Sequence, residues 1–124
     1  MVRKRPKNLN LLTIRLPVPA LVSIMHRVSG ALLFLSLPLW LLLFWLTVSS
    51  EQSYQLAQVF LHSLLVKLLL VLLAWAFFHH ACAGIRHLAL DAHLGLRLRY
   101  ARASSMMVLL LTGILLISFT VAIW

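Results

Sequence analysis

The sequence predicts an all-α membrane protein with three transmembrane helices. Hydrophobic residues make up 63% of the 124 residues and charged residues only 10%, which is more apolar surface than a soluble domain of this length can bury. Three long apolar stretches are each able to cross a hydrocarbon core of about 30 Å, because a helix rises about 1.5 Å per residue. The length allows a single domain, over residues 1–124.

The first helix is expected over about residues 19–48. Its central stretch, Ala31–Val48, contains no charge. Pro38 lies within it and removes one backbone donor, a defect that membrane helices tolerate when neighbouring groups satisfy the freed carbonyl. The polar segment Thr47–Gln55 is expected to form the turn that follows.

The second and third helices are expected over about residues 54–91 and 105–124. The second contains the apolar core Leu68–Ile85, and the third has about 20 residues without a charge, enough for one crossing. The segment His93–Ser105 is expected to be the loop between them.

Basic residues predict the orientation of these helices. They gather in the N-terminal stretch and in the second loop, whereas the first loop and the C-terminus have none (Arg3, Lys4, Arg5, Lys7, Arg15, Arg97, Arg99, Arg102). The positive-inside rule therefore places the N-terminus in the cytoplasm and the C-terminus in the periplasm. The net charge of +9 is interpreted as contact with membrane lipid and not with nucleic acid, since the basic residues flank apolar runs. No cleavable signal peptide is expected, which favours a multi-pass protein of the bacterial inner membrane.

A cluster of histidines in the second helix indicates cofactor chemistry. His80, Gly84 and His87 are spaced i, i+4, i+7 and share one helix face. A neutral imidazole can bind haem iron, and a glycine one turn away leaves room for a flat macrocycle. The neighbouring His79 points about 100° away and is an equally good ligand on chemistry alone. A histidine that only hydrogen-bonds to a neighbouring helix is the alternative to ligation.

The first helix has a second polar face. Ser23, His26 and Arg27 are spaced i, i+3, i+4, so they lie close together on the helix surface. Arg27 is charged at any relevant pH and is able to pair with a carboxylate or donate to a quinone carbonyl. The alternative is an interfacial arginine that extends to lipid headgroups.

Two motifs in this order resemble the cytochrome b subunit of succinate dehydrogenase. The first is SIMHRVSG at Ser23–Gly30, similar to S-x-x-H-R-x-S-G, and the second is HACAGIRHLALD at His80–Asp91, similar to H-x-x-x-G-x-R-H-x-x-x-D. The segment Arg5–Pro17, RPKNLNLLTIRLP, is similar to the opening RP-x-x-L of that family. The resemblance covers the whole chain, although the third helix carries no motif.

The resemblance implies a role for each motif. His80 would be an axial ligand of haem b and hence the metal ligand of this chain, with His26 and Arg27 near the haem propionates. Ser23 and Arg27 would contact ubiquinone. A partner membrane anchor subunit would supply the second axial histidine, and the iron–sulfur and flavoprotein subunits would deliver electrons from succinate. The chain would then be no enzyme on its own but a subunit of succinate:quinone oxidoreductase, an oxidoreductase of the tricarboxylic acid cycle.

Alternative functions fit the same helices. One is a fumarate reductase anchor that uses menaquinone. Another is a small proton-coupled transporter in which His80 and Lys67 relay protons, and a third is an assembly protein without a cofactor. His79, Lys67 and Cys82 have no role that the sequence assigns.

Overall fold

The described part of the chain, residues 16–124 of the computed structural model, consists of helices joined by short connections. It comprises α1 (Val18–Ser49), α2 (Glu51–Leu61), α3 (Leu64–Asp91) and α4 (Leu98–Ile123). By length and composition, α1, α3 and α4 are each able to cross a membrane. The prediction of an all-helical chain with three spans is thus confirmed.

The expected second helix, residues 54–91, is wrong as one continuous element, because α2 and α3 are separate helices. The chain breaks at His62 and Ser63, and the Ser63 hydroxyl accepts a hydrogen bond from the Val66 amide at 3.4 Å, which caps the start of α3. Ser50 caps α2 in the same way, through the Ser53 amide at 3.2 Å. The expected polar turn at 47–55 is therefore reduced to a junction at Ser50.

The expected loop at 93–105 is also too long, because α4 begins at Leu98. His93 and Gly95 both have positive φ, 61° and 73°, and the Leu94 amide donates back to the Ala89 carbonyl at 2.9 Å. Such left-handed residues end a helix by satisfying its last carbonyls. Arg99 and Arg102 consequently lie on the first turns of α4 and not in a loop.

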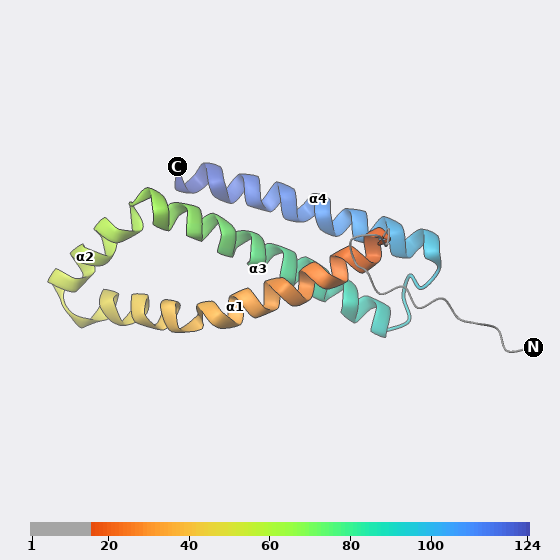
Figure 1. The fold of residues 1–124 in the computed structure, drawn as a ribbon, viewed down its shortest axis with the longest axis horizontal. Helices are drawn as coiled ribbons and strands as arrows, with labels where there is room; N and C mark the ends of the chain where they lie inside the picture. Colours follow the sequence, from red (N-terminus) through yellow and green to blue (C-terminus); the bar gives the residue numbers. More distant parts are fainter. Residues whose placement is uncertain (1–15) are drawn as a thin grey trace, which may run out of the picture.

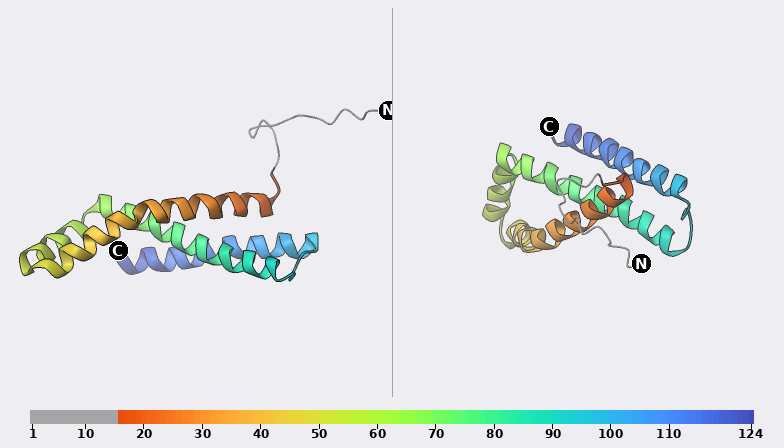
Figure 2. Two further views of the ribbon diagram at one scale, coloured as in Figure 1. Left: turned by 90° about the horizontal axis from the view of Figure 1, so that it is seen from below. Right: turned by 45° about the vertical axis from the view of Figure 1, so that its right-hand side comes forward.

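Helix α3 is the central element, with α1 packed on one side and α4 on the other (Figure 1). α1 crosses α3 in the half of the molecule where α1 begins, and the two helices diverge toward the other end, where α2 bridges them (Figures 1 and 2). Val22, Ala83 and Val108 form a buried cluster among the three long helices. Small residues permit this close approach, since Ala76, Ala83 and Ser29 are fully buried.

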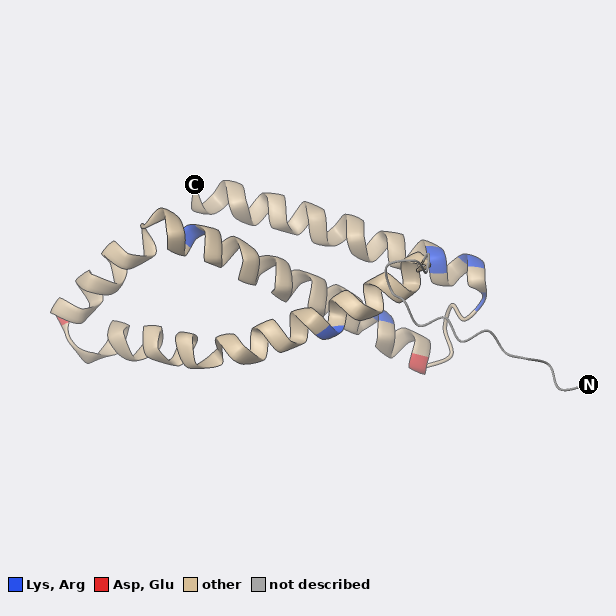
Figure 3. Ribbon diagram, in the orientation of Figure 1, with Lys and Arg blue, Asp and Glu red and all other residues tan. Residues whose placement is uncertain are grey.

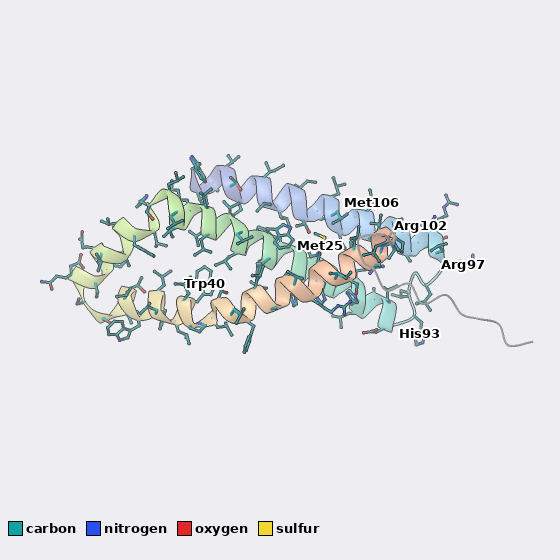
Figure 4. All side chains as sticks on the ribbon, viewed as in Figure 1. Met25, Trp40, His93, Arg97, Arg102 and Met106 are labelled. Atoms are coloured by element: carbon teal, nitrogen blue, oxygen red, sulfur yellow. The ribbon has the colours of Figure 1, made fainter. Side chains whose placement is uncertain are left out.

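The diverging half of α1 contains Pro38 and is lined by large apolar side chains. Trp40 points from α1 into the space between α1 and α3 (Figure 4). There it lines a pocket together with leucines of both helices. Its indole N–H donates to the Ser36 hydroxyl at 3.2 Å, and Ser36 donates in turn to the Leu33 carbonyl at 2.7 Å. These local bonds satisfy polar groups that lipid cannot solvate.

Among the described residues, arginines gather toward one end of the long axis, where Asp91 at the end of α3 also lies (Figure 3). Arg97, Arg99 and Arg102 lie at the end that holds the start of α1 and the α3–α4 connection, whereas Glu51 and Lys67 lie toward the opposite end (Figure 3). Arg3, Lys4, Arg5, Lys7 and Arg15 lie outside the described residues. A cytoplasmic N-terminus and a periplasmic C-terminus stay predictions based on this charge pattern.

Candidate functional site

Three imidazoles from two helices stack on one another near the α1–α3 crossing. The His26 ring of α1 lies between two rings of α3: it is 4.2 Å from His80 at an interplanar angle of 13°, and 4.8 Å from His87 at 23°. The structure therefore brings together two motifs that are more than fifty residues apart in the sequence. We call His26, His80 and His87 the histidine cluster.

Hydrogen bonding defines the tautomer of His80. Its Nδ1 lies 3.2 Å from the His26 carbonyl oxygen. A carbonyl only accepts, so Nδ1 carries the proton, and in the neutral imidazole the lone pair is then on Nε2. The His80 side chain is only half-buried. This arrangement, with one ring nitrogen fixed by a backbone carbonyl, is typical of histidines that bind metal through the other nitrogen.

His79, the neighbouring residue, has a different environment. Its side chain is fully buried, its Nε2 is 3.4 Å from the Val22 carbonyl oxygen, and its ring stacks on Trp75 at 5.7 Å. Its Nδ1 is buried and has no hydrogen-bond partner among the described residues. The 100° between successive residues on a helix thus places one imidazole inside the helix packing and leaves the other partly open.

Ser23, His26 and Arg27 were predicted to share one face, but helix packing gives His26 and Arg27 different surroundings. His26 turns toward α3, whereas Arg27 is exposed and donates through Nε to the Ser23 carbonyl at 3.4 Å. No hydrogen bond joins Arg27 to the histidine cluster among residues 16–124. A guanidinium has five N–H donors, so most of those on Arg27 are left for other partners.

The described residues do not form a metal site with several protein ligands. No three His, Cys, Asp or Glu side chains between residues 16 and 124 are grouped so that they could hold a metal ion. Structural zinc needs four such groups, whereas haem iron takes a single histidine on each face.

Comparison with known proteins gives the family. The family model described as "Succinate dehydrogenase/Fumarate reductase transmembrane subunit" matches residues 1–119. The chain belongs to this family. Similar curated proteins include the succinate dehydrogenase cytochrome b556 subunit of Coxiella burnetii, which is 39% identical over the whole of both chains. That of Paracoccus denitrificans is 36% identical over 82% of this chain and 78% of its own, and that of Rickettsia felis is 33% identical over 77% and 74%.

The family resemblance seen in the two motifs is therefore confirmed, and the chain is a membrane subunit of the succinate dehydrogenase cytochrome b type, a class of electron-transport protein. The relatives are themselves subunits of succinate dehydrogenase. These matches do not assign roles to individual residues, for which the geometry described above is the evidence.

The sequence did not reveal one buried contact of this subunit, between Arg86 and α4. Arg86 is 8% exposed, and its Nε donates to the Ser104 hydroxyl at 3.0 Å while Nη2 donates to the Ala101 carbonyl at 3.3 Å. An arginine inside a membrane helix signals that a partner is needed. Ser104 could not be predicted as the partner of Arg86, because it was expected to lie in a loop.

The other residues without an assigned role have local partners. The Lys67 ammonium lies 5.2 Å from the centroid of the Trp124 ring, which is a cation–π contact between α3 and the end of α4. Cys82 is half-buried and packs against the buried Val22, Ala83 and Val108 cluster, in agreement with the packing role typical of a free cysteine.

Proposed function

We propose that this chain is the haem b-binding membrane anchor subunit of succinate dehydrogenase, with His80 as the axial ligand that it contributes. In this function the chain anchors the iron–sulfur and flavoprotein subunits and helps to form the site where ubiquinone is reduced. The family supports the anchor role, and the name cytochrome b556 of the relatives supports haem b.

The observation that carries the proposal is the bond between His80 Nδ1 and the His26 carbonyl at 3.2 Å. This bond leaves Nε2 of the half-buried ring free to bind a metal through its lone pair, and it holds the ring in one orientation. His79 fits this role poorly, because its fully buried ring is enclosed by Val22 and Trp75. A bound haem supplies one-electron transfer. The protein contributes by holding the His80 imidazole in a fixed orientation.

A second axial ligand from this chain does not fit the geometry. His26 could not hold the same haem as His80, because its ring lies flat against the His80 ring at 4.2 Å and leaves no room for a macrocycle between them. His87 is seven residues further along α3, an axial offset of about 10 Å. These constraints support a ligand from a partner anchor subunit, which would make haem b a shared cofactor.

Arg27 and Ser23 are proposed as the quinone-binding residues of this chain. Arg27 is exposed and has unused donors beside the histidine cluster. A quinone carbonyl gains negative charge as the molecule is reduced, and a fixed guanidinium donor stabilises that charge. We propose that Arg27 also pairs with a carboxylate of a haem at His80, with His26 near by, although the His26 Nε2 is itself enclosed against Gly84 of α3.

The test compares His80 with its neighbour in the purified complex. His80→Ala is expected to lose or strongly perturb the reduced-minus-oxidised haem spectrum, while His79→Leu and the surface variant His62→Ala retain it. An unchanged spectrum in His80→Ala, or its loss only in His79→Leu, would overturn the assignment of the ligand.

The same preparation separates the alternative functions. A fumarate reductase anchor would copurify with menaquinone and show a reaction favoured with menaquinol, which redox titration detects. A proton-coupled transporter would show no Soret band at all in the purified complex.

A further inference from the structure

We infer that Gly30 and Ser29 are positioning residues for the axial ligand, because they form a notch in α1 that fixes the His80 imidazole. The notch is defined by Gly30, Ser29 and the His26 carbonyl. The inference rests on the proposed function, since it assumes that His80 binds the haem iron.

The first side of the notch is the missing side chain of Gly30. A Cβ built on Gly30 would lie 2.8 Å from Cε1 and 3.1 Å from Nδ1 of His80. Both distances are shorter than ordinary van der Waals contact. The imidazole of α3 therefore occupies the space that any other residue at position 30 would fill with its own side chain.

The other helical glycines show that this contact is specific. At Gly84 the nearest side-chain atom to a built Cβ is His26 Nε2 at 3.6 Å, an ordinary contact, and at Gly113 nothing lies within 4 Å. Alanine is thus accommodated without rearrangement at Gly84 and Gly113. Only at Gly30 must a side chain of the histidine cluster move, and the atom that must move belongs to His80.

The second side of the notch is the Ser29 hydroxyl. Ser29 is fully buried, and its Oγ donates to the His26 carbonyl at 2.9 Å. This is the carbonyl that accepts the His80 Nδ1 proton at 3.2 Å. The same carbonyl is the helical acceptor of the Gly30 amide, and each added donor weakens the bonds of the others, so the Ser29 hydroxyl limits how much electron density the carbonyl returns to the imidazole.

These contacts give the two residues different effects on the haem. A side chain at position 30 displaces the ring that must reach iron, so it weakens the Fe–N bond. Loss of the Ser29 hydroxyl leaves the carbonyl more fully available to Nδ1–H, which makes the imidazole a stronger donor and favours ferric iron. The first change acts on haem retention, and the second acts on the midpoint potential.

The experiment uses the assembled complex with two matched variants, Gly30→Ala and Gly113→Ala. Haem per complex, the low-spin signature in the electron paramagnetic resonance spectrum, and the haem affinity are measured. Gly30→Ala is expected to lower haem affinity by about 10-fold to 100-fold, as changes beside a metal ligand do, and to shift the spectrum toward high spin. Gly113→Ala is expected to match the parent complex.

Redox titration provides the second arm. Ser29→Ala is expected to shift the haem midpoint to lower potential, whereas Ser118→Ala, which removes a hydroxyl bonded only to the Ile114 carbonyl of its own helix, is expected to leave it unchanged. Normal haem affinity and spectrum in Gly30→Ala would overturn the inference. So would failure of that complex to assemble, because the ring and not the backbone is expected to yield. Haem retained in His80→Ala would instead overturn the proposed function itself.

Discussion

Ser104→Ala tests how α4 is held against α3. The Ser104 hydroxyl accepts from Arg86 Nε at 3.0 Å, and after its removal only the weaker bond from Nη2 to the Ala101 carbonyl, at 3.3 Å, remains. Hydrogen bonds to charged groups contribute about 1.5–3 kcal/mol in soluble proteins, whereas interhelical bonds in bilayers average about 0.6 and reach about 1.7 kcal/mol. The two ranges meet near 1.5 kcal/mol, which is roughly a tenfold change in a local opening equilibrium.

Hydrogen exchange by mass spectrometry in lipid nanodiscs measures that equilibrium. The amides of the first turns of α4, from Leu98 to Ser105, are expected to lose protection about tenfold in Ser104→Ala. Ser104→Thr keeps the hydroxyl and should keep the protection, and Ser118→Ala at the far end of α4 should not alter these amides. Protection unchanged in Ser104→Ala, or an equal loss in Ser118→Ala, would show that the Arg86 contact does not hold the two helices together.

Three further outcomes are expected. Arg27→Leu should depress quinone reduction while succinate oxidation with an artificial electron acceptor persists, and equal loss of both activities would contradict a quinone-specific role. Trp124→Leu removes the ring beneath Lys67, a contact of about 0.5–1 kcal/mol, so the last turn of α4 should lose amide protection by about twofold to fivefold, while Lys67→Arg should retain it. A reporter fused after Trp124 should read periplasmic, and a cytoplasmic reading would reverse the topology.

The spans were predictable from the sequence because hydropathy determines them directly. An apolar run long enough to cross the bilayer has no stable alternative to a helix, so α1, α3 and α4 follow from composition. The break between α2 and α3 was not predictable from hydropathy, because the residues on both sides of His62 and Ser63 are compatible with a helix. It depends on a single serine cap at Ser63, which gives a weak signal among many serines.

The site was predictable only in part. Helical spacing placed His80 and His87 on one face, and the structure brings both to His26. Spacing gives the angles between residues of one helix but not the direction from which another helix approaches. The choice between His79 and His80, and the partner of Arg86, therefore depend on how α1 and α4 pack against α3, which the sequence alone does not state.

The depths of Arg27 and His80 support a common ligand. With 32 and 28 residues, α1 and α3 are about 48 Å and 42 Å long and exceed a core of about 30 Å by about 18 Å and 12 Å. If each helix is centred, Arg27, nine residues into α1, lies roughly 5 Å inside the boundary, and His80, eleven residues from the end of α3, lies roughly 10 Å inside. An arginine at the shallower depth is able to reach headgroups. In the proposed function the same arginine would instead pair with a carboxylate of a haem bound by His80 at the greater depth, an arrangement that would also give the half-buried His80 ring a ligand.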